Sequence, residues 1–288
     1  MTSAPKLTIG LATYDDYHGV YFSVQALRMY HPEIMRQTEI IIVDNNPNSP
    51  HGKELKHFSN SGSNIRYIPY SEEVGPANCK NQVFVNARAP YVICMDGHIL
   101  FESGSLKKLM DVYEQDPETD DLYQGPLVYD DLNNVSTHFD PVWRGQMYGI
   151  WATDHRGRDK NGEPFEIGMT GCGIFSCRKA AWLGFNKLFR GFGGEEGYIH
   201  KKFQQKGRKC WCLPFLRWVH RFGRPDGVKY PLTLENKVRN YFIGHLELGL
   251  DTEPVVEHFK EFYDENKIRQ ICELSYKELK NSEQCVIR

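Results

Sequence analysis

The sequence predicts an α/β protein with a mostly parallel β-sheet flanked by helices, followed by a helical extension at its C-terminal end. Two observations lead to this fold class. Apolar, strand-like runs alternate with helix-like segments over the first hundred residues, which is typical of a parallel sheet covered on both faces. From about Pro254 onward the chain is polar, with apolar residues at helical spacing.

Continuous apolar runs with β-branched residues predict the strands. A fifth strand, opened by glycine, is expected much later in the chain than the others. The five ranges are 7–13, 39–44, 65–69, 91–96 and 171–176.

Helices are expected where apolar residues recur every three or four positions, or where proline and glycine mark the ends. One helix begins at Gly75-Pro76, and another follows Gly194 and ends at Gly207. Two more are expected at about 20–30 and 105–115.

Residues 116–170 are polar and lack a clear periodicity. A long irregular segment in a compact domain is usually a lid or a binding loop. Exposed aromatic rings there would suit the flat apolar faces of sugars or bases, so Trp143, Arg144 and Trp151 are candidate acceptor-binding residues. The alternative is that the tryptophans anchor the loop to the core.

Composition narrows the class of protein. The chain has 288 residues and a net charge of −2, without an apolar run long enough to span a membrane or an apolar N-terminal signal core. We therefore expect a cytoplasmic protein without a transmembrane segment. Its eight cysteines form no CxxC pair, so we expect free thiols rather than disulfides or a zinc site.

Asp96 and His98 are a candidate metal-binding pair. Side chains two residues apart in an extended chain point the same way, and Gly97 leaves room for a ligand between them. A carboxylate oxygen and an imidazole nitrogen together suit Mn²⁺ better than Mg²⁺, which prefers sites made only of oxygen ligands. His220 could supply a third ligand, although a lone histidine is more often structural. The alternative is a strand that ends in a turn, with Asp96 capping a helix.

Polar residues end two other predicted strands: Thr13-Tyr14-Asp15 and Asp44. Ligands gather at the carboxyl ends of strands in such sheets. We therefore expect these residues and Asp96 to form one site.

Gly193-Gly194-Glu195-Glu196 matches the dinucleotide-binding fingerprint poorly, because two acids at a helix start would repel a diphosphate. One interpretation is a capped helix. In the other, the glycines let a substrate approach while the carboxylates bind sugar hydroxyls or accept a proton.

Residues 178–239 hold fifteen lysines and arginines against four acids, a local charge of +11. This segment could attract a diphosphate donor and an anionic acceptor, or it could be a solvated surface balanced by the acidic remainder.

Taken together, these motifs resemble nucleotide-sugar glycosyltransferases of the GT-A fold grouped around family 2, over about residues 6–225. Asp44 is similar to the family's uracil-contacting acid, and Gly75 to Asn81 to its Gly-x-x-x-x-Arg-Asn helix start, with Lys80 in place of arginine. Asp96-Gly97-His98 resembles the Asp-x-His metal motif of polypeptide N-acetylgalactosaminyltransferases, in which a later histidine, here His220, completes the site.

Two further segments, the strand around Gly173 and the later Gly193-Gly194-Glu195, resemble both the polypeptide N-acetylgalactosaminyltransferases and the β-1,4-galactosyltransferases. The galactosyltransferases are inverting and carry, after Gly-Gly-Glu, an Asp that acts as the general base. The N-acetylgalactosaminyltransferases are retaining and carry Asn at that position. This chain has Glu196 there, so we expect inversion, with Glu196 as the base and Glu195 positioning a sugar.

The resemblance implies a donor-binding set of Thr13, Tyr14, Asp15, Asp44, Lys80, Asn81, Asp96, Gly97 and Gly173. It also implies a UDP-sugar donor and Mn²⁺ or Mg²⁺ as cofactor. The basic segment 178–239, rather than the resemblance, predicts an anionic acceptor, either an acidic or phosphorylated glycan or a modified nucleic acid.

The implied domains are a glycosyltransferase domain over 1–230 and a helical extension over 231–288. Within the first, residues 1–100 would bind the nucleotide and 101–230 the acceptor.

Two other functions stay open. A nucleotidyltransferase would want a basic glycine-rich loop after the first strand, where this chain has the acidic Tyr14-Asp15-Asp16. A non-catalytic glycan- or nucleic-acid-binding module would not need Asp96, His98 and His220 together.

Overall fold

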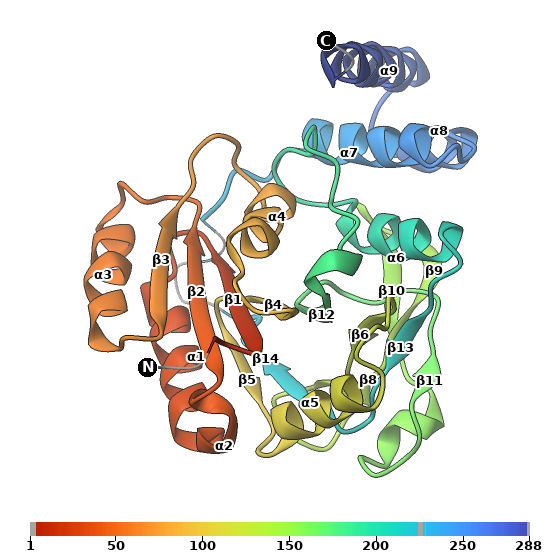
Figure 1. The fold of residues 1–288 in the computed structure, drawn as a ribbon. Helices are drawn as coiled ribbons and strands as arrows, with labels where there is room; N and C mark the ends of the chain where they lie inside the picture. Colours follow the sequence, from red (N-terminus) through yellow and green to blue (C-terminus); the bar gives the residue numbers. More distant parts are fainter. Residues whose placement is uncertain (1–3, 224–226, 228, 287–288) are drawn as a thin grey trace.

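The computed structural model describes residues 4–223, 227 and 229–286. Arg224 and Asp226 of the basic segment therefore lie outside the described residues. Within the described chain, the main sheet has the strand order β11-β13-β6-β12-β4-β1-β2-β3 (Figure 1). Its strands are β1 Leu7–Thr13, β2 Thr38–Asp44, β3 Ile65–Pro69, β4 Tyr91–Asp96, β6 Leu122–Gln124, β11 Phe165–Glu166, β12 Ile174–Arg178 and β13 Cys210–Cys212.

The N-terminal half of this sheet is parallel, as the sequence predicts. β1 pairs in parallel with both β2 and β4, and β2 with β3, whereas β12 is antiparallel to β4. All seven residues of β1 and of β2 are buried, which is why both strands appear as continuous apolar runs. The expected α/β class is confirmed.

Helices cover this half of the sheet (Figure 1). Asp16 caps the first of them by accepting the Gly19 N–H at 3.0 Å, and Pro76 occupies the first turn of α4. The α-helices up to residue 205 are α1 Tyr17–Tyr30, α2 Pro32–Met35, α3 Pro50–Phe58, α4 Pro76–Asn86, α5 Ser105–Gln115 and α6 Glu195–Gln205.

The prediction that residues 116–170 are irregular is wrong. Besides β6 and β11 they contain β7 Leu127–Val128, β8 Val135–Ser136, β9 His138–Arg144 and β10 Met147–Ala152. β9 and β10 form an antiparallel hairpin whose turn contains Gly145 at a φ of 53°. The strands outside the hairpin are too short for a visible period, and β6, β7 and β11 pair with strands distant in the sequence. The hairpin has a local signal, a two-residue turn containing glycine.

A second sheet forms from distant segments. β5 Ile99–Phe101 pairs antiparallel with β14 Trp218–His220, and its full order is β5-β14-β7-β8. Ile99 lies opposite His220 in this pairing. The pairing therefore brings the end of β14 next to the segment that follows β4.

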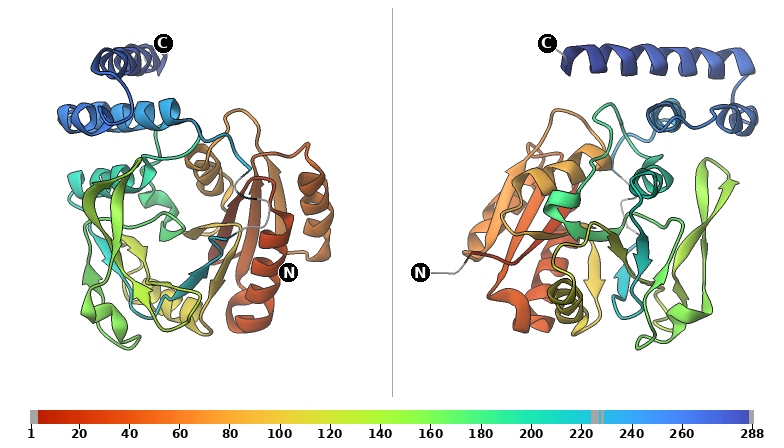
Figure 2. Two further views of the ribbon diagram at one scale, coloured as in Figure 1. Left: turned by 180° about the vertical axis from the view of Figure 1, so that it is seen from behind. Right: turned by 45° about the vertical axis from the view of Figure 1, so that its right-hand side comes forward.

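The C-terminal extension consists of α7 Leu234–Glu247, α8 Glu253–Phe259 and α9 Glu265–Val286. These helices stack at one end of the molecule, beyond α4 and α6 (Figures 1 and 2). They have a hydrophobic core of their own that includes Val238, Phe242 and Phe259, against which Trp143 packs. No helix in the described part of the chain is both long and apolar enough to cross a membrane.

Candidate active site

Asp96, His98 and His220 converge at the carboxyl end of β4. One ligand atom from each lies within 4.8 Å of those of the others. His98 Nε2 is 3.2 Å from His220 Nε2, which is 3.5 Å from Asp96 Oδ2. The β5–β14 pairing places His220 here, so the three predicted ligands come together from segments more than a hundred residues apart.

Lys80 neutralises the carboxylate of this cluster. Its Nζ lies 2.9 Å from Asp96 Oδ1 and donates to the Cys172 carbonyl at 2.7 Å. Burial alone would raise the pKa of Asp96, but the Lys80 ammonium and the His220 imidazole hold it well below its ordinary value. Burial would likewise lower the pKa of Lys80, and Asp96 raises it instead. Asp96 is therefore ionised and ready to bind a cation.

Asp16 is a site residue that the sequence analysis missed. One carboxylate oxygen caps α1, and the other lies 2.8 Å from His98 Nδ1. A carboxylate on Nδ1 orients the imidazole, so that Nε2 faces Asp96 and His220. The available signal was an aspartate directly before a helix, which predicts the cap but not the contact with His98.

A cavity of about 410 Å³ opens beside the cluster. It contains both charged groups and broad apolar surfaces. Its lining includes Lys80, Asp96, Gly173 and His220, and also Glu195 and Glu196. Aromatic side chains complete the wall, namely Phe139, Trp151, Phe192, Trp218, Phe222 and Tyr230.

The two glutamates begin α6, where the positive end of the helix dipole favours carboxylates. Glu195 is 2 % exposed, and its Oε2 accepts the Gly193 N–H at 2.8 Å. Its Oε1 is buried without a hydrogen-bond partner among the described residues. Burial raises the pKa of Glu195, and the charge of Glu196 adds to this. Burial also raises the pKa of Glu196.

Gly193 and Gly194 have φ angles of 109° and 93°, a region that only glycine adopts readily. The C-terminal extension contributes Lys237 to this place, since a Cβ on Gly193 would lie 2.7 Å from its side chain. The charges of Glu195 and Glu196 counteract the effect of burial on Lys237, whose pKa is lowered overall. Lys237 is a second residue that the sequence analysis did not single out.

The ends of β1 and β2 lie next to this site. Thr13 and Tyr14 line a small cavity together with Asn45, Asp96 and Tyr230. Tyr14 also contacts Tyr230 edge to face, with ring centroids 5.2 Å apart.

Asp15 and Asp44 are held in constrained places. Asp15 has a φ of 53°, unusual for a residue other than glycine. Asp44 is fully buried and accepts hydrogen bonds from the Tyr67 hydroxyl at 2.7 Å and the Asn46 N–H at 2.9 Å. Its neighbour Asn45, rather than Asp44, lines the small cavity.

The remaining predicted residues are distributed unevenly. A Cβ on Gly97 would clash with Val20, and one on Gly173 with Trp218, so both glycines permit close packing. Asn81 is bonded to Phe185 through both ends of its amide, at 2.9 Å each, and so holds that segment.

Of the three predicted acceptor residues, the structure brings only Trp151 to the cavity beside the metal cluster. Trp143 stacks on His258 and packs against Tyr241, and it lines a separate cavity of about 400 Å³ between the β9–β10 hairpin and the helices. Trp143 therefore fits the alternative interpretation, in which the tryptophan anchors its segment to the rest of the protein. Arg144 is exposed at the end of β9.

The basic segment 178–239 is not one free cationic face. Arg178 and Arg208 pair with Asp120, and Lys209 pairs with Glu166. Lys202 pairs with Glu247. The acids in these pairs come from outside the segment, so they neutralise part of its charge, and the anionic acceptor stays a prediction.

Residues 8–182 match the model of the family described as glycosyl transferase family 2. A curated relative is the dolichol-phosphate mannosyltransferase of Saccharomyces cerevisiae, 29% identical over 80 residues. That match covers 28% of this chain and 30% of the relative, so the chain aligns with less than a third of the relative's length.

Solved structures share the fold. GalNAc-T7 with UDP, GalNAc and Mn²⁺ superposes with a TM-score of 0.69 at 13% identity, covering 96% of this chain and 55% of that one. Residues 1–349 of TarS from S. aureus superpose with a TM-score of 0.53 at 11% identity, covering 93% of this chain and 69% of that one. The TarS complex with UDP-GlcNAc gives the same TM-score at 13% identity, covering 93% and 70%. At these identities the likeness shows the GT-A fold, which confirms the expected architecture.

Proposed function

Because this chain belongs to glycosyl transferase family 2, we propose that it transfers a sugar from a nucleoside diphosphate sugar to an acceptor hydroxyl. The observation that carries the proposal is the arrangement of one cavity. Asp96 and His220 of the Asp96–His98–His220 cluster line this cavity, and so do the carboxylates of Glu195 and Glu196. One cavity therefore offers ligands for a cation that would hold a diphosphate leaving group and carboxylates that could act as a base.

The donor that fits best is a UDP-sugar. Two of the structural neighbours were solved with UDP or with UDP-GlcNAc. In this chain, Thr13 and Tyr14 stand at the end of β1, beside Asp96, where the nucleotide of such a donor would lie. Asp44, buried under the same edge of the sheet, would shape the base pocket together with Asn45.

The cluster fits a divalent metal. One ionised carboxylate and two imidazoles, with their ligand atoms within 4.8 Å of one another, are a donor set that suits Mn²⁺. A metal held by Asp96, His98 and His220 would balance the charge of the diphosphate and stabilise it as a leaving group. Lys80 and Asp16 would keep the carboxylate and one imidazole in the required orientation and protonation state.

Glu196 would act as the base in an inverting displacement. It lines the cavity, and its raised pKa lets it accept the proton of an acceptor hydroxyl at neutral pH. Glu195, with one free oxygen, would accept a hydrogen bond from a sugar hydroxyl. The aromatic wall around Trp151 suits the apolar face of an acceptor sugar, so we propose a glycan acceptor rather than nucleic acid.

Donor hydrolysis tests the proposal. The protein is incubated with Mn²⁺ and a panel of UDP-sugars, and free UDP is measured. We expect release of UDP from at least one donor, dependent on Mn²⁺ and abolished in His98→Ala. A protein that releases diphosphate from nucleoside triphosphates and leaves every UDP-sugar intact would be a nucleotidyltransferase instead. Failure of UDP with Mn²⁺ to raise the melting temperature would contradict the proposed site.

A further inference from the structure

The C-terminal helices hold the loop that leads into the two glutamates. This loop, residues 186–194, runs directly into Glu195 at the start of α6. It contains Gly191, Gly193 and Gly194, all with positive φ angles. Glycines of this kind give a loop little conformational preference of its own, so its shape depends on what surrounds it.

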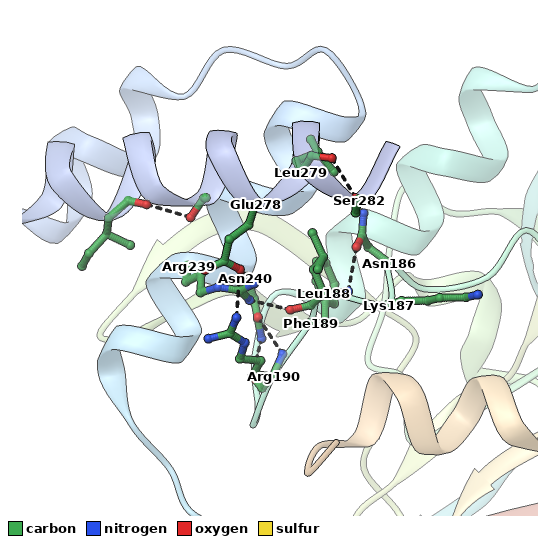
Figure 3. A network of polar contacts seen from close by, with 12 residues as sticks. Asn186, Lys187, Leu188, Phe189, Arg190, Arg239, Asn240, Glu278, Leu279 and Ser282 are labelled. Carbon is green, nitrogen blue, oxygen red and sulfur yellow. Dashed lines mark hydrogen bonds and ion pairs between the residues drawn. The ribbon is translucent and has the colours of Figure 1, made fainter. Parts of the chain in front are cut away.

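Asn240 on α7 binds the loop from the side of the extension (Figure 3). It is fully buried, and its Oδ1 accepts the Arg190 N–H at 3.0 Å. Its Nδ2 donates to the Arg190 carbonyl at 2.8 Å and to the Gly193 carbonyl at 2.9 Å. Both amide protons and the amide oxygen are therefore committed to the loop, two residues before Glu195.

A cluster of charges supports this contact (Figure 3). Arg239, next to Asn240, donates to the Leu188 carbonyl at 2.5 Å and pairs with Glu278 of α9. Glu278 also accepts from Arg190 at 2.9 Å. One carboxylate on the last helix thus binds a loop residue and the α7 residue that holds the loop. Charge-assisted hydrogen bonds of this type are stronger than neutral ones.

The opposite side of the loop is held by α4 and the residues before it. Asn78 donates to the carbonyls of Lys187 and Phe189 at 3.1 and 2.9 Å. The Gly191 N–H donates to the Val74 carbonyl at 2.7 Å. Successive carbonyls of the loop therefore alternate between α4 and α7.

Only one of these two anchors lies within residues 8–182, which match the family model. The other comes from α7 and α9, which follow that region in the sequence. The extension therefore completes a frame that the family domain supplies in part.

We propose that Asn240 and the Arg190–Arg239–Glu278 cluster are positioning residues, which set the orientation of Glu195 and Glu196 toward the cavity. The inference rests on the proposed function, because positioning matters only if these carboxylates act on a substrate. A displacement of about 1 Å at a reacting group can reduce turnover by roughly 10²-fold. The donor-binding residues proposed above, Thr13, Tyr14 and the Asp96–His98–His220 cluster, are not part of this frame, so donor binding should not depend on it.

The experiment compares Asn240→Ala and Glu278→Gln with the wild-type protein and with Glu253→Gln. The control removes a pairing of α8 with Arg269 of α9, inside the same extension but away from the loop. We expect both test variants to lower the turnover number by roughly 10- to 100-fold. Their dissociation constant for UDP with Mn²⁺, measured by calorimetry, should stay within about twofold of wild type. The control should match wild type in both quantities.

Hydrogen exchange of residues 186–196 gives a second measurement that does not depend on activity. We expect faster exchange there in both test variants and unchanged exchange in the control. Glu278→Gln preserves side-chain size on a partly exposed residue, so it remains informative if Asn240→Ala does not fold. Unchanged turnover, a parallel loss of donor affinity or unchanged loop exchange would overturn the inference. Absence of UDP binding by the wild-type protein would instead overturn the proposed function, while loop exchange would still report on the frame.

Discussion

The Lys80 ammonium lies 2.9 Å from Asp96 Oδ1 and joins α4 to the end of β4. The Lys80 side chain is 5 % exposed, so its charge is largely removed from water and has to be compensated by the Asp96 carboxylate. The resembling family has arginine at this position. Lysine supplies a compact point charge, which suits the single carboxylate oxygen and single carbonyl that it contacts here.

Replacing Lys80 with methionine should destabilise the protein. The substitution leaves the Asp96 carboxylate without its cation, and breaking a buried pair in this way typically lowers the free energy of unfolding by about 3–5 kcal/mol. Urea denaturation measures the change. Lys201→Met, on the exposed side of α6, is the matched control and should change stability by less than about 0.5 kcal/mol. Equal stability of the two variants would show that the Lys80–Asp96 pair does not contribute to the free energy of unfolding.

Replacing Asp16 with asparagine should weaken metal binding without removing a metal ligand. The asparagine oxygen can still cap α1, but the neutral amide no longer holds His98 Nδ1 as a carboxylate does. Loss of such outer contacts typically lowers metal affinity by roughly 10- to 100-fold. Calorimetry with Mn²⁺ measures it. His18→Ala, an exposed histidine on α1, should leave the affinity unchanged, and an Asp16→Asn protein with wild-type affinity would exclude the orienting role.

Replacing Glu196 with glutamine should slow transfer while the donor still binds. Glutamine keeps the size of the side chain but cannot accept the proton, so we expect turnover to fall by about 10²–10⁴. The anomeric configuration of the product, determined by NMR, should be opposite to that of the donor. Retention of configuration would place the protein among retaining glycosyltransferases, and a fully active Glu196→Gln enzyme would exclude Glu196 as the base.

The pH dependence of turnover should depend on Lys237. Burial raises the pKa of Glu196, so activity should increase as the pH rises through that elevated pKa and the carboxylate ionises. Lys237 is a nearby cation that opposes this shift. Its replacement by methionine removes a charge that favours the carboxylate, so the acidic limb of the profile should move to higher pH. A limb that stays in place or moves to lower pH would show that Glu196 does not govern it.

Several features of this protein follow from local sequence. β1 and β2 are buried on both faces, so their continuous apolar runs predict a central parallel sheet. Asp96 ends β4, the strand that pairs with β1, and Asp96-Gly97-His98 predicts a metal-binding pair at the carboxyl edge of that sheet. Glu195-Glu196 after two glycines predicts a helix start rich in acid. Such features are legible because residues close in sequence determine them.

Other features depend on contacts between distant segments. His220 reaches His98 only because β14 pairs with β5, and no periodicity in either three-residue strand signals that pairing. The same limit explains the strands missed within 116–170 and the position of Trp143, which packs against helices over ninety residues later in the chain.

The sequence by itself determined the α/β class and the residue types available for binding a metal and a diphosphate. Tertiary structure decided which of these residues meet. It placed Lys80 beside Asp96, Asp16 beside His98, and Asn240 against the loop before Glu195. Backbone preferences act over a few residues, whereas the charge, burial and orientation of a side chain are set by neighbours that only the folded chain assembles.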